Sequence, residues 1–134
     1  MAVVKDEQLP LRSAEDIVTV RQAVRVWATE IGFGLVDQTK IVTAASELGR
    51  NTVQHGLGGI ARLELCNDGP RQGLRLTFED TGPGIPDIAL AMKDGYSTGG
   101  GMGLGLSGSK RLSNEFEIES TVGKGTRVTI ARWK

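Results

Sequence analysis

The sequence predicts an α/β two-layer sandwich, in which a mixed, mainly antiparallel sheet is covered on one face by helices. Apolar residues recur at three- and four-residue spacing within residues 13–32 and 37–56, as they do in amphipathic helices. Apolar and polar residues alternate in residues 60–66 and 74–80, as they do in strands with one buried face. The turn-forming sequence NDGPRQG between these two strands predicts that they pair as an antiparallel hairpin.

The N-terminal part of the chain carries signals for a strand and then a helix. Residues 2–11 are expected to form a first strand that is broken near Pro10. Ser13 predicts the N-cap of the first helix, with Asp16 in an acidic first turn. The apolar stripe of this helix consists of Ile17, Val20, Val24, Trp27 and Ile31. A second helix is expected to begin at Asp37 and to end at the glycines that follow residue 55.

The C-terminal half is expected to contain shorter elements. Residues 87–93 predict a short helix, and the glycine-rich residues 94–105 predict a long mobile loop. Residues 106–112 predict another helix. In residues 115–119 apolar side chains alternate with glutamates, and a tight GKG turn separates this strand from a last strand at residues 126–133.

The composition limits the class of protein. A chain of 134 residues is expected to form one domain, residues 1–134, with an ordinary core. The 16 basic and 16 acidic residues balance, which argues against a nucleic-acid or membrane surface. The single cysteine, Cys66, cannot form an intramolecular disulfide, so a reduced, cytoplasmic compartment is expected. The first ten residues lack a signal-peptide core, and no apolar run is long enough to span a membrane.

Several polar side chains fall at the border of the predicted core. Glu47 and Asn51 are four residues apart on the second helix, so they stack on one face of it. Asp80 lies by alternation on the apolar face of its strand, and Thr126 lies on the apolar face of the last strand. An aspartate at that place either caps the following TGPG loop or receives a hydrogen bond from a bound ligand. The alternation pattern leaves both interpretations open.

The glycine-rich segments do not fit two common phosphate-binding motifs. A P-loop would need a lysine where Ser109 stands. Gly103, Gly105 and Gly108 spell GxGxxG, but no strand precedes them directly, as a dinucleotide-binding fold would require. The signatures of the eukaryotic-type protein kinases are also missing from the sequence.

Four motifs occur instead in a fixed order: the Glu47 and Asn51 pair on a helix, DTGPGIPD after a strand, GGGMGLGLSG before a helix, and GKGT before the last strand. This combination resembles the GHKL superfamily of ATPases and kinases, with its Bergerat nucleotide-binding fold. The runs VDQTKIVTAASELGRN, EDTGPGIPDIALAMKDGYSTGGGMGLGL, SKRL and VGKGT resemble the stressosome switch-protein kinases of the RsbT type. More distantly, the chain is similar to the anti-sigma-factor kinases.

The resemblance implies how the base of a nucleotide is bound. Asp80 is expected to accept a hydrogen bond from the exocyclic amine of adenine, where guanine presents a carbonyl oxygen instead. Losing such a charged hydrogen bond costs about 1.5–3 kcal/mol. Gly82 and Gly84 are expected to let the backbone pass close to the base. Thr126 is expected to hold the adenine edge, directly or through a water molecule.

The resemblance also implies roles at the phosphate end. Asn51 is expected to offer a carbonyl oxygen to Mg²⁺, and Glu47 is expected to be the general base, with orientation of Asn51 or a water as its alternative role. Arg50 and Lys110 are the nearest candidates to neutralise the γ-phosphate, unless they are simply solvated. The backbone N–H groups of the lid are expected to bind phosphate. These lid residues are Gly101, Met102, Gly103, Leu104 and Gly105.

The function implied by the resemblance is that of a cytoplasmic, magnesium-dependent serine/threonine protein kinase. Its expected substrate is a serine of a STAS-domain antagonist in a bacterial stress-signalling partner switch, with a phosphatase as a downstream partner. One alternative is a nucleotide-dependent anti-sigma-type module whose main work is sequestration. The other is a stand-alone histidine-kinase-like catalytic domain, which Gln54 and the missing phosphoacceptor hairpin disfavour. The only histidine, His55, is expected to lie at a helix C-terminus.

Overall fold

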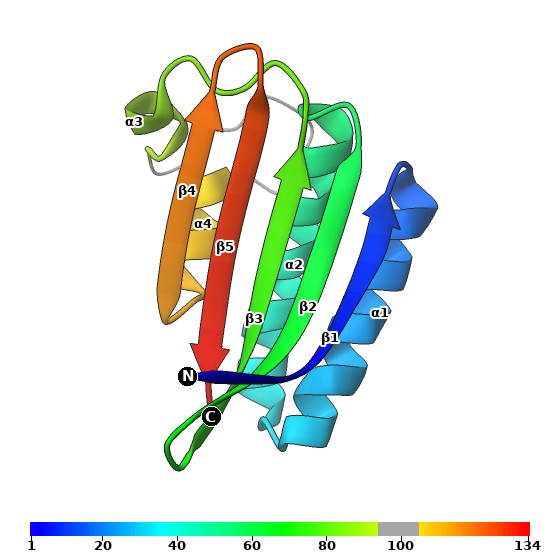
Figure 1. Cartoon of the computed structure of the whole chain (residues 1–134), viewed down its shortest axis with the longest axis vertical. Coiled ribbons are helices and arrows are strands. Elements are labelled where there is room, and N and C mark those ends of the chain that lie inside the picture. Colours follow the sequence, from blue (N-terminus) through cyan, green and yellow to red (C-terminus); the bar gives the residue numbers. More distant parts are fainter. Residues whose placement is uncertain (94–104) are drawn as a thin grey trace.

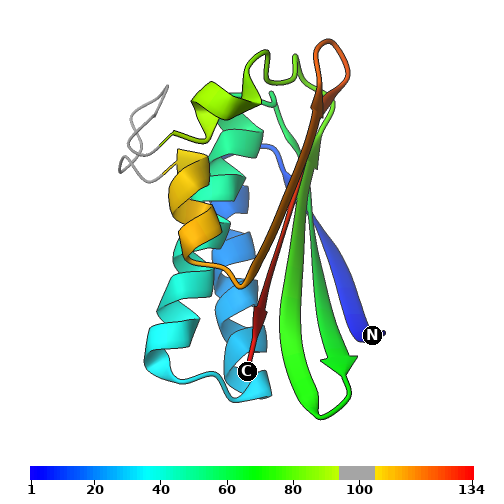
Figure 2. The ribbon, with the colours of Figure 1, turned by 90° about the vertical axis from the view of Figure 1, so that its left-hand side faces the viewer.

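The structure is a computed structural model of the 134-residue chain that describes residues 1–93 and 105–134. The predicted mobile loop of residues 94–105 lies, apart from Gly105, outside the described residues. The described residues form two layers, a sheet and a set of helices that covers one of its faces (Figures 1 and 2). The predicted α/β two-layer sandwich is therefore confirmed.

The described residues contain one five-stranded sheet with the strand order β1-β2-β3-β5-β4. The strands are β1 Ala2–Leu11, β2 Gly59–Asp68, β3 Arg71–Asp80, β4 Glu115–Thr121 and β5 Gly125–Trp133. All four neighbouring pairs are antiparallel. The expectation of a mainly antiparallel sheet therefore holds, but the sheet formed by these strands is not mixed. The predicted hairpin is formed by β2 and β3, and its turn contains Gly69 with a φ of 61°.

The described helices are α1 Ala14–Ile31, α2 Leu35–Gln54, α3 Ile88–Ala91 and α4 Gly105–Arg111. The first helix begins as predicted, because the Ser13 side chain accepts a hydrogen bond from the Asp16 backbone N–H. It ends at Gly32, whose φ of 93° reverses the chain. The second helix begins at Leu35, before the predicted start at Asp37. Its first residues are exposed, so they lie outside the buried stripe from which the start was predicted.

The core lies between the inner face of the sheet and the long helices α1 and α2. Its most deeply buried large side chains include Leu11, Ile41, Leu48, Leu63, Leu74, Leu76 and Ile130. Trp27 is 4% exposed and belongs to this core, as its place in the apolar stripe of α1 predicts. No described helix is both long enough and apolar enough to cross a lipid bilayer.

The outer face of the sheet is polar but contains three side chains that are largely shielded from water. Glu64 on β2 is 8% exposed and receives two hydrogen bonds from Arg75 on β3, at 2.9 and 3.1 Å. This bidentate hydrogen bond raises the pKa of the Arg75 guanidinium. Cys66 lies on the same face of β2, and its burial raises the pKa of its thiol.

Elements that carry three of the four sequence motifs meet at one end of the sandwich. The C-terminal end of α2, the end of β3 and the beginning of β5 all lie at this end, beside α3 (Figure 1). Phe78 on β3 pairs with Val128 on β5, which places the motifs that follow and precede these residues next to each other. The antiparallel register of the sheet therefore builds the candidate site.

Candidate functional site

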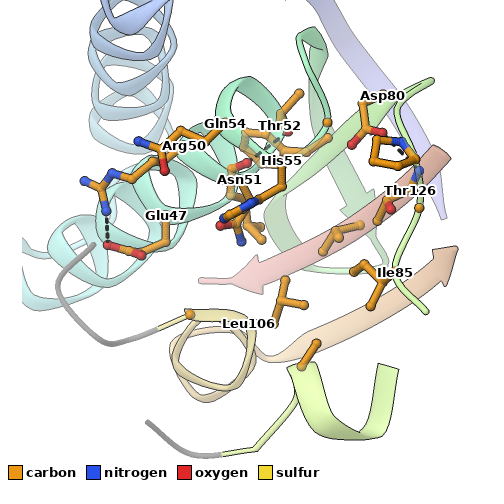
Figure 3. Close-up of a pocket in the computed structure, with 18 of the residues that line it drawn as sticks. Glu47, Arg50, Asn51, Thr52, Gln54, His55, Asp80, Ile85, Leu106 and Thr126 are labelled. Carbon is orange, nitrogen blue, oxygen red and sulfur yellow. Dashed lines mark hydrogen bonds and ion pairs between the residues drawn. The ribbon is translucent and has the colours of Figure 1, made fainter. Parts of the chain in front are cut away.

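A cavity of about 400 Å³ lies at this end of the molecule, between α2, the sheet and the shorter helices α3 and α4 (Figure 3). This volume falls within the usual range of ligand-binding clefts, about 300–1,000 Å³. Glu47, Asn51, Asp80 and Thr126 all line it. Residues that are far apart in the sequence are thus brought to one cavity, as the four motifs predict.

Asp80 lies at one end of the cavity. Its two carboxylate oxygens differ in the hydrogen bonds that they accept. Its Oδ1 accepts hydrogen bonds from the backbone N–H groups of Gly82, at 3.0 Å, and Thr126, at 3.2 Å. The interpretation of Asp80 as a turn-capping residue therefore holds for this oxygen. The residues that the structure describes give Oδ2 no hydrogen bond. One carboxylate oxygen thus organises the loops, and the other lies against the backbone of Gly56.

Glycines let these loops pack backbone against backbone around Asp80. A Cβ atom on Gly56 would overlap the Asp80 carboxylate, and one on Gly82 would lie 2.5 Å from the Gly56 carbonyl oxygen. Gly84 has a φ of 79°, and a Cβ there would overlap the Thr121 carbonyl oxygen. The structure thus gives Gly82 and Gly84 a packing role, while their closeness to a base stays a prediction. Gly56 was not predicted as a site residue, because its role depends on the neighbouring strand.

A hydroxyl network lies beside Asp80. Thr126 Oγ1 is 2.8 Å from Ser120 Oγ, and Ser120 Oγ also accepts the backbone N–H of Ile85 at 2.8 Å. Ser120 Oγ is 3.2 Å from the Gly125 carbonyl oxygen, to which it can donate. The sequence analysis missed Ser120. Alternation along β4 could have indicated it, since Ser120 shares a face with Phe116 and Ile118.

The walls of the cavity between its two ends are apolar. Phe78 and Val128 come from the sheet, and each lies two positions along its strand from Asp80 or Thr126. The other walls come from the loop after β3 and from the shorter helices, and the residues that form them are Ile85, Leu90, Ala91 and Leu106. Flat apolar rings such as those of a purine fit between walls of this kind.

The other end of the cavity is formed by the polar face of α2 (Figure 3). Glu47 is only 5% exposed, and Arg50 Nη1 lies 2.9 Å from its Oε1. Arg50 is therefore held by an ion pair rather than simply solvated. Asn51 is half-buried and lines the cavity, and His55 caps the C-terminal end of α2, as predicted.

Some of the predicted site residues do not reach the cavity or fall outside the described residues. Lys110 is exposed in the last turn of α4 and does not line the cavity. Gly82 lies behind Asp80 rather than in the cavity wall, whereas Gly105 does line it. The predicted lid residues Gly101, Met102, Gly103 and Leu104 lie outside the described residues.

The donor set of α2 suits a metal ion that takes most of its ligands from a substrate. Residues 1–93 and 105–134 contain no group of three or more His, Cys, Asp or Glu side chains that could hold a metal ion by themselves. Asn51 contributes a neutral amide oxygen, a type of ligand that Mg²⁺ accepts together with phosphate oxygens and water. Asn51 therefore fits the role of a single protein ligand to a magnesium ion.

Comparison with known proteins finds a matching family and several similar proteins. Residues 36–134 match the family described as histidine kinase-, DNA gyrase B-, and HSP90-like ATPases. The chain is 48% identical over 118 residues to the serine/threonine-protein kinase RsbT of Bacillus subtilis. This alignment covers 88% of this chain and 89% of that protein. It is 29% identical over 118 residues to the anti-sigma F factor of Clostridium kluyveri. This alignment covers 84% of this chain and 82% of that protein.

A solved structure shares the fold. The crystal structure of the RsbU and RsbW domains of a Mycobacterium tuberculosis protein matches with a TM-score of 0.63 and 22% sequence identity. The match covers 98% of this chain but only 33% of that longer chain. At this level of identity the likeness concerns the fold alone.

Proposed function

This chain belongs to the family of histidine kinase-, DNA gyrase B-, and HSP90-like ATPases and is an ATP-dependent protein serine/threonine kinase, and we propose that its substrate is a serine of a STAS-domain antagonist. We place this reaction in a cytoplasmic partner switch of bacterial stress signalling, with a phosphatase downstream. The observation that carries the proposal is the nearly buried Glu47 carboxylate, which lines the same cavity as Asn51 and Asp80.

The Asp80 end of the cavity would hold the adenine ring. Because Oδ1 of Asp80 is occupied by two backbone N–H groups, Oδ2 is the oxygen that would accept the adenine amine. Phe78 and Val128 would lie against the ring, and the Thr126 hydroxyl would complete its polar edge. A guanine base would bring a carbonyl oxygen to the carboxylate, so adenine nucleotides are preferred in this proposal.

The α2 end of the cavity would hold the phosphates. Asn51 would bind a magnesium ion, which when present neutralises charge on the phosphate oxygens. Glu47 lies one helical turn before Asn51 on the same face. Gly105, the first residue of α4, also lines the cavity.

In the transfer step Glu47 would act on the acceptor serine. Its carboxylate accepts the proton of the serine hydroxyl while the serine oxygen forms a bond to the γ-phosphorus of ATP. The bond between that phosphorus and the bridging oxygen breaks, and ADP leaves. The ion pair with Arg50 holds the Glu47 side chain in one orientation for this proton transfer.

The test is a labelling assay with Mg-ATP and purified STAS-domain proteins encoded near this chain. Wild-type protein is expected to place acid-stable phosphate on serine. Glu47→Ala is expected to reduce labelling by about 10²–10⁴-fold, the usual contribution of a general base, while binding ATP as tightly as wild type does. Glu117→Ala, which removes an exposed acid from β4, is the matched control. Undiminished labelling by Glu47→Ala would refute the base role, and acid-labile phosphate would indicate histidine chemistry.

A second candidate function is nucleotide-dependent sequestration of a partner protein, which the likeness to an anti-sigma F factor favours. In that case ATP binding, rather than phosphoryl transfer, controls the partner. The same assay separates the two functions, because sequestration predicts a stable ATP-dependent complex with no phosphate transferred to any STAS-domain protein.

A further inference from the structure

We propose that Ser120 is a specificity-determining positioning residue that makes the Thr126 hydroxyl a pure hydrogen-bond acceptor toward the nucleotide base. This inference rests on the proposed binding of ATP in the cavity and adds a residue to it. Ser120 itself does not line the cavity, and it would act through Thr126, which does. Figure 3 shows Thr126 beside Asp80 at the same end of the cavity.

The inference starts from the three neighbours of the Ser120 hydroxyl oxygen. The backbone N–H of Ile85 donates to this oxygen at 2.8 Å. The carbonyl oxygen of Gly125 lies 3.2 Å away and can only accept. The Thr126 hydroxyl lies 2.8 Å away and could donate or accept. Ser120 has a single hydroxyl proton to share between the last two.

The positions of the protons follow from these neighbours. If Ser120 gave its proton to Thr126, its oxygen would face the Gly125 carbonyl oxygen at 3.2 Å with no proton between them, and the two oxygens would repel each other. If Ser120 gives its proton to Gly125, all three contacts are hydrogen bonds, and Thr126 donates to Ser120. A hydroxyl has one donor and two acceptor sites, so this arrangement saturates Ser120. The Thr126 oxygen then presents only lone pairs to the cavity.

A pure acceptor at this place discriminates between nucleotide bases. Asp80 Oδ2 and Thr126 Oγ1 would together form an edge that contains acceptors and no donor. The amino group of adenine supplies two N–H donors to such an edge, directly or through a water molecule. A base without this amino group would leave the acceptors without partners, which costs binding free energy. Ser120 would thus contribute to selection of adenine without touching it.

A competing interpretation gives Ser120 a structural role only, because its hydrogen bond with Ile85 also holds the loop after β3. The two interpretations differ in what they predict for related nucleotides. Loss of a loop anchor weakens the binding of any nucleotide equally. Loss of a fixed hydroxyl orientation weakens the preference for the amino group, since the freed Thr126 hydroxyl can turn and donate.

The experiment measures the dissociation constants of ATP and of purine riboside triphosphate, which lacks only the 6-amino group, by calorimetry. The preference for the amino group is the dissociation constant of purine riboside triphosphate divided by that of ATP. Ser120→Ala is expected to reduce this ratio by about 3–10-fold, the value of one neutral hydrogen bond. Thr126→Val is expected to reduce the ratio similarly, and Ser120→Ala is expected to add nothing in that background. Ser120→Thr keeps the hydroxyl and is expected to keep the ratio. Ser113→Ala, which removes a serine that donates to the Ser109 carbonyl at the end of α4, is the matched control.

The outcomes are distinct. An unchanged ratio in Ser120→Ala, with both nucleotides weakened alike, would overturn the inference and leave the proposed kinase function intact. If adding Ser120→Ala to Thr126→Val reduced the ratio by the same factor again, the inference would also be overturned. Equal binding of the two nucleotides by the wild type would instead overturn the proposed adenine site, and the inference with it. If Ser120→Ala does not fold, an altered ratio in Ser120→Thr would overturn the inference, since that variant retains the hydroxyl.

Discussion

The guanidinium of Arg50 and the carboxylate of Glu47 form an ion pair within α2, with 2.9 Å between Nη1 and Oε1. The two side chains differ in their exposure, 29% for Arg50 and 6% for Glu47. The acid is thus enclosed, while its partner is partly exposed. This ion pair within one helix gives the proposed general base a fixed orientation.

We predict that Arg50→Ala slows phosphoryl transfer by about 10–100-fold, because a misplacement of about 1 Å is enough for a loss of that order. Arg50→Lys can restore one hydrogen bond to Glu47 and is expected to recover part of the rate. Single-turnover labelling measures both variants. Arg71→Ala is the control, since this arginine forms an exposed ion pair with Asp68 at the β2–β3 turn. A wild-type rate in Arg50→Ala would show that Glu47 needs no partner.

Replacement of Asp80 tests the base end of the cavity. Asp80→Asn keeps the size of the side chain but replaces one carboxylate oxygen by an NH₂ group. Its affinity for ATP is expected to fall by about 1.5–3 kcal/mol, roughly 10–150-fold, because a charged hydrogen bond is lost. Calorimetry with ATP and GTP checks this prediction. A wild-type protein that binds both nucleotides equally would contradict the assignment of Asp80.

Gly56 offers an independent test of the same contact, because its backbone lies directly against the Asp80 carboxylate. Gly56→Ala is expected to displace this side chain and to weaken ATP binding by at least about 10-fold, close to the loss of one charged hydrogen bond. Gly34→Ala is the matched control, since an added Cβ there meets nothing within 4 Å. ATP affinity unchanged in Gly56→Ala would mean that Asp80 does not need this position.

The ion pair on the outer face of the sheet is expected to contribute to stability. Arg75→Ala leaves the Glu64 carboxylate, 8% exposed, without its two hydrogen bonds, so the free energy of unfolding should fall by about 1.5–3 kcal/mol. Arg127→Ala removes an exposed arginine from the same face, and a loss of no more than about 1 kcal/mol is expected. Urea unfolding measures both variants. Equal losses of unfolding free energy in the two variants would show that burial of the Glu64 carboxylate does not strengthen the contribution of its ion pair.

The buried thiol of Cys66 is expected to make the free energy of unfolding depend on pH in the alkaline range. Burial raises the pKa of its thiol, so the folded chain retains this proton at a pH at which the unfolded chain has released it. The contribution is therefore complete below the unfolded thiol pKa of about 8.5, and it is lost as the pH rises toward the folded value. The difference in unfolding free energy between wild type and Cys66→Ala is expected to shrink over this range. A difference that stays constant through pH 10 would contradict the prediction.

The sequence was sufficient to predict much of the end of the cavity that contains Asp80 and Thr126. Alternation along a strand predicts that Asp80 and Thr126 face the core, and the register of β3 with β5 brings them together. The same parity argument places Phe78 and Val128 on the core-facing side of their strands. These positions follow from local periodicity, which a sequence displays directly.

Contacts between neighbouring elements were harder to predict. The need for glycine at position 56 depends on how close the end of α2 comes to the end of β3, and no local pattern shows that distance. The burial of Glu64 depends likewise on Arg75, which lies opposite it on the next strand. Lys110, for which the sequence left a phosphate contact and simple solvation open, is exposed in the last turn of α4 and does not line the cavity.

The contact between Gly56 and Asp80 also limits how this enzyme can be re-engineered. Chemical genetics often shortens a bulky wall residue so that a kinase accepts an ATP analogue with an enlarged N6 substituent. Here the wall beside Asp80 is the backbone of a glycine, which has no side chain to shorten. If adenine binds at Asp80 as proposed, an orthogonal nucleotide would have to carry its extra group away from Gly56.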